Sequence, residues 1–260
     1  MKEYILITGA SSGIGLEMTR LLAEKNHNLI LIARNAEKLQ SIQSELMKIH
    51  PVDIDFFPFD LAEPGAAVEI HRAMKEKGYQ ITGLINNAGF GEYGPFWMMP
   101  LATLEQMVAI NITALMGLTR LFGEDMVQKQ KGRILHVASL LSFLPFPYYS
   151  VYSSTKAFVL DFSETIAAEM ESKGVVVTTL CPGTVETPFH TDSMRKTHAM
   201  RANRPMSAHA VAQAGVRLFL SGHGKKVVGT QNWFLSNLPR LTPDRWMMRV
   251  KIHLASLVTS

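Results

Sequence analysis

A tyrosine and a lysine stand one helical turn apart in the segment YSVYSSTK, at Tyr152 and Lys156. Residues four apart share one face of a helix, so the Lys156 ammonium can approach the Tyr152 hydroxyl. A free tyrosine has a pKa of about 10, and a nearby cation lowers that pKa because it stabilises the phenolate. Such a phenol can give a proton to a carbonyl oxygen or take one from an alcohol. Tyr148 and Tyr149 lack a lysine at this spacing and are expected to line a substrate cleft or its approach.

The elements that must position this pair follow an alternating pattern. Short apolar runs at 4–8, 29–33, 52–60, 81–89, 132–139, 174–183 and 225–229 predict strands. Stretches with helical spacing lie between them, at 14–26, 36–50 and 150–173. Short buried strands that alternate with helices are typical of an α/β fold with a doubly wound parallel sheet covered on both faces. A length of 260 residues suits one such domain.

Parallel sheets of this kind bind ligands beyond the carboxyl ends of their strands. The residues that follow the first six predicted strands are therefore candidates for a site. They are Gly9, Arg34, Asp60, Asn87, Ser139 and Pro182.

The loop after the first strand, TGASSGIG, is rich in glycine. Gly9, Gly13 and Gly15 let the backbone turn sharply and come close to a phosphate, and the next helix offers free amide hydrogens to a pyrophosphate. Ser11 and Ser12 add hydroxyl donors. The alternative is a tight turn with no ligand, but the place between the first strand and the first helix favours dinucleotide binding.

The end of the second strand indicates which dinucleotide is bound. No Asp or Glu occurs between Asn28 and Ala36, where an NAD site often has an acid for the ribose 2′-hydroxyl. Arg34 stands there instead, and a guanidinium pairs with a 2′-phosphate. We therefore expect NADP(H) to be preferred over NAD(H); the alternative is a solvated arginine at the start of a loop.

Six motifs, taken in order, resemble the classical short-chain dehydrogenase/reductase (SDR) family. They are TGASSGIG, NNAG at 86–89, Asn111 in VAINI, Ser139 in ILHVAS, the Tyr152/Lys156 pair, and PGTVET at 182–187. The resemblance covers residues 4 to 187. It implies a single Rossmann-type domain with a seven-stranded parallel sheet, NAD(P)-linked carbonyl/alcohol chemistry, and a homodimer or homotetramer.

The resemblance also implies residue roles. Ser139 would hold the substrate oxygen beside Tyr152, and Asn111 would support a water that links Lys156 to solvent, which makes these four the predicted catalytic set. The predicted cofactor-binding set is Gly9, Ser11, Ser12, Gly13, Ile14 and Gly15 for the pyrophosphate, Arg34, Asp60 and Leu61 for the adenosine, Asn87, Ala88 and Gly89 for the ribose, Tyr152 and Lys156 for the nicotinamide ribose, and Pro182, Gly183, Val185 and Thr187 around the carboxamide. Ser154 and Thr155 replace the Ala and Ser of many relatives, and both are small.

Three segments outside the motifs carry further expectations. Residues 187–206 stand where the family has a mobile substrate lid, and the alternative is a disordered surface loop. Around 240–260 a basic amphipathic helix with Trp246, Val250, Leu254 and Leu257 would contact either an anionic membrane or, as is commoner, a subunit or the parent domain. An apolar cleft, and hence a partly apolar substrate, is expected from Phe90, Phe96, Trp97, Phe143 and Phe146; the stretch 90–100 could equally complete the core or an oligomer contact.

Composition excludes several other classes. A net charge of +4 is too small to indicate nucleic-acid binding. The nine histidines show no metal-ligand spacing and one cysteine cannot build a zinc site, so we expect no metal. We read His136 as a core or near-cofactor residue and Cys181 as a buried, inert thiol. A single cysteine suits a reducing compartment, so we expect a cytoplasmic protein, and we find no run of about 18 apolar residues.

These observations predict an NADP(H)-dependent oxidoreductase, a carbonyl reductase or its reverse, with Tyr152 as general acid/base. The alternative from another class is a non-catalytic NADP(H)-binding sensor of the same fold. An epimerase or dehydratase usually adds a substrate domain, for which this chain has no room. Steroid, acyl-chain, sugar and small xenobiotic carbonyl compounds all remain open as substrates.

Overall fold

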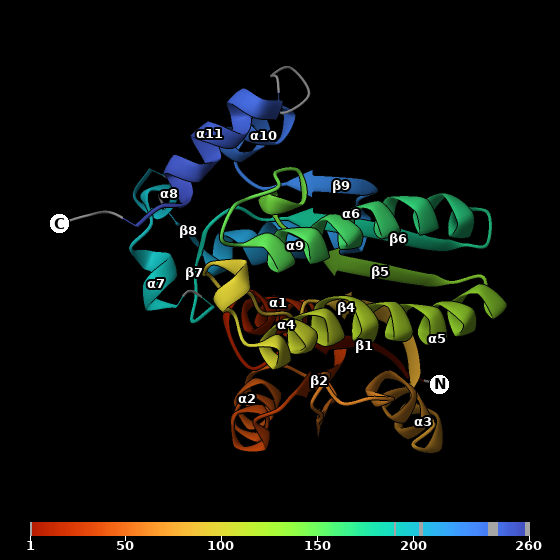
Figure 1. The fold of residues 1–260 in the computed structure, drawn as a ribbon. Coiled ribbons are helices and arrows are strands. Elements are labelled where there is room, and N and C mark those ends of the chain that lie inside the picture. Colours follow the sequence, from red (N-terminus) through yellow and green to blue (C-terminus); the bar gives the residue numbers. More distant parts are fainter. Residues whose placement is uncertain (1, 190, 203–204, 239–243, 258–260) are drawn as a thin grey trace.

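The computed structural model describes residues 2–189, 191–202, 205–238 and 244–257 (Figure 1). Parts of the expected lid and C-terminal extension lie outside the described residues, as does the side chain of Trp246. The main sheet has the order β3-β2-β1-β4-β5-β6-β9, and every neighbouring pair is parallel. Its strands are β1 (Glu3–Thr8), β2 (Asn28–Ala33), β3 (Ile54–Pro58), β4 (Gln80–Asn86), β5 (Gly132–Val137), β6 (Val175–Cys181) and β9 (Gly224–Val227).

The sheet confirms the α/β fold and all seven predicted strands. Their continuous apolar sequences are explained by burial on both faces: in β1 every residue after Glu3 is buried. Helices cover the two faces. One face carries α1 (Gly13–Glu24), α2 (Ala36–Ile49) and α9 (Ala208–Ser221); the other carries α3 (Ala66–Glu76), α5 (Leu115–Gln128) and α6 (Ser150–Glu171).

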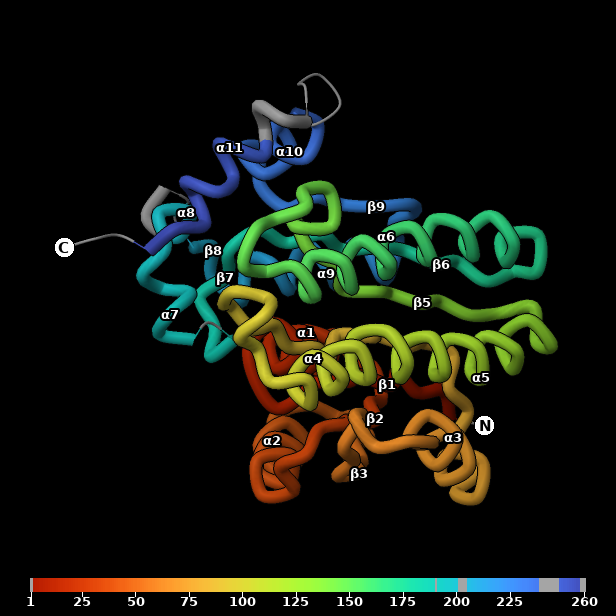
Figure 2. The backbone as a smooth tube through the Cα atoms, viewed as in Figure 1, coloured from red at the N-terminus to blue at the C-terminus, as the bar shows by residue number. Residues whose placement is uncertain are grey.

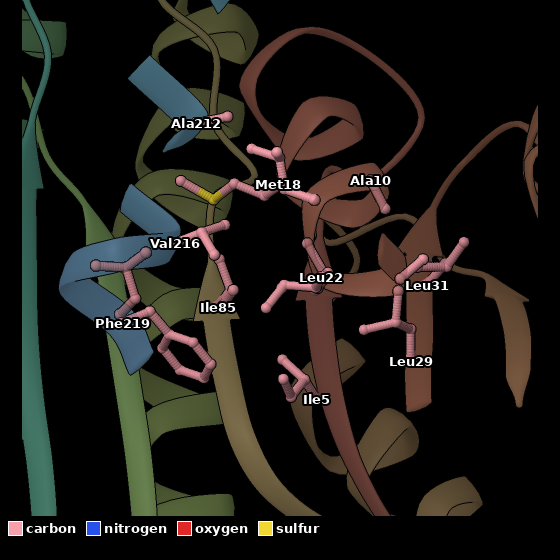
Figure 3. Close-up of a cluster of buried hydrophobic side chains, with 14 of the residues drawn as sticks. Ile5, Ala10, Met18, Leu22, Leu29, Leu31, Ile85, Ala212, Val216 and Phe219 are labelled. Atoms are coloured by element: carbon pink, nitrogen blue, oxygen red, sulfur yellow. The ribbon is translucent and has the colours of Figure 1, made fainter. Parts of the chain in front are cut away.

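Two apolar clusters hold these layers together. Figure 3 shows the first, in which Met18 and Leu22 of α1 and Phe219 of α9 pack on strand residues such as Ile5 and Ile85. The second lies under α3 and α5 on the opposite face, around Leu6, Ile70 and Phe122. The sheet between them is rigid, so its strand ends can place side chains accurately.

A long helix between β4 and β5 was absent from the predicted elements. It runs through α4 (Leu101–Val108), a π-helical segment (Ala109–Ala114) and α5, after a 3₁₀ turn at Phe96–Met98. Within the described residues this helix, 101–128, is long and apolar enough to span a membrane by length and mean hydropathy, which corrects the expectation from the sequence. Its buried side chains Leu118, Phe122 and Met126 pack in the second cluster, so one side of the helix covers the sheet.

The remaining elements gather beyond the carboxyl ends of the strands. They are β7 (Val185–Glu186), α7 (Asp192–Arg195), α8 (His198–Ala202), β8 (Met206–Ser207), α10 (Thr230–Asn237) and α11 (Asp244–Ala255). In Figures 1 and 2, α7, α8 and α11 lie side by side at this edge. The segment that carries α7 and α8 is connected to the residues that follow α11. The connection is a backbone bridge between Thr197 and Leu257 and a hydrogen bond from His198 N to Ser256 O (3.2 Å). We therefore expect a ligand site at this end of the molecule.

Candidate active site

A cavity of about 950 Å³ opens at the carboxyl ends of the strands. Eighteen of the predicted site residues line it: Gly9, Ser11, Ser12, Gly13, Ile14, Arg34, Asp60, Leu61, Asn87, Ala88, Gly89, Ser139, Tyr152, Lys156, Pro182, Gly183, Val185 and Thr187. Two predicted residues, Gly15 and Asn111, do not line the cavity but contact residues that do. The fold thus brings together residues that are far apart in the sequence.

The glycine turn is shaped for close approach of another group. Gly9 and Gly13 have positive φ values of 67° and 55°. At Gly15 an added Cβ would lie 2.2 Å from Gly9 O and 2.4 Å from Asn87 Nδ2, so no side chain fits there. Ser12 is the N-cap of α1, but its side chain makes no capping hydrogen bond. The first amide hydrogens of α1 therefore face the cavity without a side-chain cap, as a phosphate site requires.

Asn87 and Thr8 connect the glycine turn to the end of β4. The Asn87 side chain donates from Nδ2 to Thr8 O (3.0 Å) and to Gly9 O (3.3 Å). The Thr8 hydroxyl accepts hydrogen bonds from the backbone N–H groups of Asn87 and Ala88, both at 3.0 Å. Thr8 is a site residue that the sequence analysis did not single out; its place at the end of a buried strand was the available signal.

Two basic side chains line the part of the cavity next to the end of β2. The Arg34 side chain is 71% exposed, and its Nη1 lies 4.0 Å from Asp60 Oδ2. Asp60 also accepts a hydrogen bond from Ala62 N at 3.0 Å, which fixes the carboxylate. Lys38, four residues after Arg34 on the first turn of α2, lines the same part of the cavity. Sequence analysis missed Lys38; its place in the first turn of the helix that follows the second strand was the available signal.

Asn111, in the π-helical segment, connects the loop after β4 to α6. Its Oδ1 accepts from Phe90 N (3.1 Å), and its Nδ2 donates to Phe90 O (2.9 Å) and to Thr155 Oγ1 (3.0 Å). A Cβ on Gly89 would lie 2.9 Å from Asn111 Oδ1 and 3.3 Å from Lys156 Nζ. The loop after β4 is therefore fastened to the helix that carries Lys156. Thr155 keeps the hydroxyl that this contact needs, so the departure from Ser at that position preserves the geometry.

Ser139 lies at the end of β5 beside Tyr152. Its hydroxyl accepts from Leu141 N (3.1 Å), while Ser142 Oγ accepts from Ser139 N (3.2 Å) and donates to Lys156 O (2.7 Å). These bonds connect the loop that begins at Ser139 to α6. A hydrogen bond from the Ser139 side chain acts to lower the Tyr152 pKa, although burial dominates.

The expectation that Lys156 lowers the pKa of Tyr152 is wrong for the described chain. Burial raises the pKa of Tyr152 to about 12, and only the Ser139 hydrogen bond opposes it. Lys156 Nζ donates instead to Val137 O at 2.8 Å and lies 6.0 Å from the Tyr152 ring centroid. Burial also lowers the pKa of Lys156 to about 8. Desolvation disfavours both charged forms, so the phenol is protonated at neutral pH.

His136 and Cys181 belong to the core. The His136 ring is fully buried between Thr119 Oγ1 (2.9 Å) and Ser163 Oγ (2.6 Å), and burial, followed by the charge of Lys156, lowers its pKa to about 3. Burial raises the pKa of the Cys181 thiol to about 12, so this cysteine is an inert thiol. Among the described residues no three His, Cys, Asp or Glu side chains gather as metal ligands.

The substrate end of the cavity is mostly apolar, but its lining differs in part from the prediction. Phe90, Phe146 and Tyr149 line it, as do Leu144, Phe189, Met194, Met200, Leu235 and Leu254. Phe96 and Trp97 do not: they are 58% and 80% exposed on the 3₁₀ turn that leads into α4. Phe143 packs near Val159 and Leu160 instead. Tyr148 is also outside the lining; its ring packs against Tyr93, at 5.6 Å between centroids.

The described parts of the expected lid and extension are folded. Met194 and Thr197 are fully buried, and Thr197 lines the cavity. Val250 on α11 and Leu257 just after it, both in the predicted apolar stripe, are 41% and 48% exposed, whereas Lys251 and Ala255 are buried. The face of α11 that is buried therefore differs from the predicted apolar stripe. This face packs against the cavity wall and α8, which do not form a continuous apolar surface. Whether 187–206 moves as a lid stays a prediction.

Comparison with protein families gives one clear match. The model of the family described as short chain dehydrogenase matches residues 3–198, which include the glycine turn, Ser139, Tyr152 and Lys156. That range is about three quarters of the chain.

Characterised relatives and solved structures agree with this match. The chain is 32% identical over 191 residues to 17-beta-hydroxysteroid dehydrogenase type 3 of Homo sapiens, covering 72% of this chain and 60% of the relative. It is 31% identical over 246 residues to very-long-chain 3-oxoacyl-CoA reductase of Pyrenophora tritici-repentis, covering 90% and 71%. The structure of a short-chain dehydrogenase from Sphingobium yanoikuyae in complex with NADPH superposes with a TM-score of 0.79 at 26% identity, covering 92% and 93%. The match thus spans about three fifths of the length of the human relative.

Proposed function

The chain belongs to the short-chain dehydrogenase family, and from this premise we propose that it is an NADP(H)-dependent oxidoreductase that interconverts a carbonyl compound and its alcohol. The observation that carries the proposal is that one cavity is lined both by the glycine turn, whose amide groups suit a phosphate, and by Ser139, Tyr152 and Lys156. The human and Pyrenophora relatives carry names that describe chemistry at a CH–OH or C=O group, which supports the same reaction class.

The residues present fit a dinucleotide. Gly9 and Gly13 line the cavity with positive φ values that turn the backbone sharply there, and the first amide groups of α1 carry no side-chain cap. Gly9, Ser11 and Ser12 would hold the pyrophosphate, while Asn87 and Lys156 would hold the riboses. When bound, the nicotinamide supplies a hydride to the carbonyl carbon or accepts one from the alcohol carbon.

The side chains of this protein would move and position the proton. The Tyr152 hydroxyl, protonated at neutral pH, donates to the carbonyl oxygen as negative charge develops there. Ser139 donates a hydrogen bond to the same oxygen and holds it beside the phenol. Lys156 Nζ, which donates to Val137 O and lies 6.0 Å from the Tyr152 ring centroid, would hold the nicotinamide ribose beside the phenol.

We propose a preference for NADP(H) over NAD(H). Arg34 is exposed at the cavity mouth with Asp60 as its ion-pair partner at a long 4.0 Å, which leaves the guanidinium able to meet a phosphate. Lys38 adds a second positive charge at the same place. The NADPH complex of the Sphingobium relative supports this preference.

A carbonyl panel tests the proposal. Wild-type protein is mixed with NADPH or NADH and with ketones and aldehydes of increasing apolar size, and loss of the reduced-nicotinamide absorbance is followed. We expect turnover with NADPH, faster for apolar compounds, and its loss by at least about a hundredfold in Tyr152→Phe.

Two controls separate an enzyme from a sensor. Tyr148→Phe removes a phenol hydroxyl outside the cavity lining and is expected to keep turnover. Tyr152→Phe is expected to bind NADPH with nearly wild-type affinity, measured by fluorescence titration. If wild-type protein binds NADPH but reduces no member of the panel, the enzymatic proposal fails and the sensor interpretation replaces it.

We also propose a cytoplasmic homodimer or homotetramer. The partly exposed apolar side chains Val108 and Met116 on the helix 101–128 support an association surface. Light scattering on the purified protein measures the mass, and a monomer at micromolar concentration would contradict this proposal.

A further inference from the structure

A glycine beside the proposed proton donor has no room for a side chain. Gly91 lies in the loop after β4, is buried and lines the cavity. A Cβ added there would lie 2.7 Å from Tyr152 Cδ2, 2.9 Å from Tyr152 Cγ and 3.1 Å from Phe189 Cζ. Carbon atoms that are not bonded pack about 3.5–4.0 Å apart. The ring of Tyr152 therefore occupies the space that a side chain at position 91 would need.

The backbone itself does not require glycine at position 91. Gly9 and Gly13 of the glycine turn have positive φ values, whereas Gly91 does not. A residue with a side chain could therefore adopt the backbone conformation that Gly91 has. The approach of the Tyr152 ring, and not a turn of the chain, is what excludes a larger residue here.

The loop that carries Gly91 is held in place by Asn111. Both polar backbone groups of the preceding residue, Phe90, are bonded to the Asn111 side chain. Phe90 N donates to Asn111 Oδ1 at 3.1 Å, and Phe90 O accepts from Asn111 Nδ2 at 2.9 Å. Because Gly91 follows directly, a shift of its backbone would break these bonds. The ring of Tyr152 thus packs beside a fixed stretch of backbone.

The same asparagine also holds the helix that carries the phenol. Asn111 Nδ2 donates to Thr155 Oγ1 at 3.0 Å, and the Thr155 hydroxyl donates to Tyr152 O at 2.8 Å. One side chain therefore sets the separation between the loop after β4 and α6. The contacts form a closed circuit that runs through Gly91, Phe90, Asn111, Thr155 and Tyr152.

We propose that Gly91 is a positioning residue that sets the direction of the Tyr152 phenol toward the reacting carbonyl. This inference rests on the proposed function and deepens it. A side chain at position 91 would push the ring out of its place and away from Ser139, whose side chain is hydrogen-bonded to the phenol. Displacement of a catalytic group by about 1 Å can lower a rate about a hundredfold, so the absence of a side chain here has a catalytic consequence.

The substitution Gly91→Ala tests the proposal, assayed with NADPH and with ketones of increasing size. We expect kcat to fall by about tenfold to a hundredfold for small and large ketones alike, because the proton donor is displaced for every substrate. KM for NADPH should stay nearly unchanged, since the glycine turn is not altered. If only the large ketones lose turnover, the methyl group acts by narrowing the cavity and the proposal is overturned.

A matched control is Gly94→Ala, which adds the same methyl group three residues further along the loop. The nearest described side chain, that of Met99, would lie 4.0 Å from a Cβ at Gly94, and Gly94 does not line the cavity. We expect this variant to keep the wild-type kcat for every ketone. A loss as large as that of Gly91→Ala would show that any methyl group in this loop disturbs the site, which would refute a specific role of Gly91.

Thermal melting separates the ring contact from the activity. Gly91→Ala is introduced into the wild type and into Tyr152→Ala, and both pairs are measured without dinucleotide. We expect the melting temperature to fall by about 2 °C or more in the wild-type background, and by less than about half as much where the ring is absent. An equal fall in both backgrounds would refute the ring contact even if reduction is observed. A fall that depends on the ring, in a protein that reduces no ketone, would refute the proposed reaction while Gly91 still sets the place of the ring.

Discussion

Replacement of the buried Lys156 by methionine should stabilise the protein at neutral pH while it abolishes turnover. Lys156 is 4% exposed, and burial lowers its pKa from 10.5 to about 8. Lowering of this pKa from 10.5 to about 8 means that burial penalises the charged form by about 3 kcal/mol at pH 7. Methionine has a similar shape and no charge, so this penalty disappears. Val137 O loses its donor at 2.8 Å, which costs about 1–2 kcal/mol.

The pH dependence gives the more specific signature. The folded pKa of Lys156 is lower than its unfolded value, so between about pH 8 and pH 10.5 the unfolded chain binds more protons and the free energy of unfolding rises with pH. The wild type should therefore gain about 2 kcal/mol relative to Lys156→Met between pH 7 and about pH 9.5. Tyr152, whose raised pKa acts only above about pH 10, is present in both proteins and cancels.

Urea unfolding of both proteins at several pH values measures this difference. Parallel stability curves across the range would show that Lys156 is charged without penalty, and the description of a desolvated lysine beside Tyr152 would be refuted. Both proteins should be measured without added dinucleotide, because ligand binding to the folded state would shift both curves.

Three further substitutions test other parts of the site. Arg34→Ala should raise KM for NADPH by about tenfold or more and KM for NADH much less, because a charge-assisted contact to the 2′-phosphate is lost; equal effects on the two cofactors would contradict the assignment. In Gly15→Ala the Cβ would lie 2.2 Å from Gly9 O, so we expect a loss of about 1–3 kcal/mol in the free energy of unfolding and weaker NADPH binding. Thermal melting with and without NADPH measures both effects, and an unchanged melting temperature would show that the turn can adapt. Asn111→Ala should cost about 1–3 kcal/mol in urea unfolding because the backbone groups of Phe90 lose their partners, and an unchanged midpoint would refute the supporting role.

Much of the fold could be predicted because its signals are local. Each sheet strand is a short apolar run, and the residues directly after the strands reach one cavity because parallel strands end at the same edge. The spacing of Tyr152 and Lys156 likewise required only a helix. Segments without a clear period were harder: the helix 101–128 is apolar on several sides and carries a π-helical segment, so the sequence analysis did not identify it.

Properties that depend on burial could not be obtained from spacing. The pKa of Tyr152 depends on how much apolar surface encloses the phenol, and that enclosure includes Phe189, 37 positions away, whose ring centroid lies 5.5 Å from that of Tyr152. Trp97 was predicted to line the cleft because it is a large aromatic residue in the apolar stretch 90–100, but it lies in a surface turn. Lys251 belongs to the predicted basic amphipathic segment, and only the docking of α11 against the cavity makes it a wall residue. In each case tertiary contacts override the local pattern.

Transfer of deuterium from the cofactor to the substrate carbon tests the central claim most directly. NADPH that carries deuterium at the reactive ring carbon is incubated with the protein and a ketone that the panel identifies, and the alcohol is analysed by mass spectrometry. Our account predicts deuterium on the carbinol carbon with the wild type and almost no product with Tyr152→Phe. Alcohol without deuterium, or labelled alcohol formed at the wild-type rate by Tyr152→Phe, would contradict it.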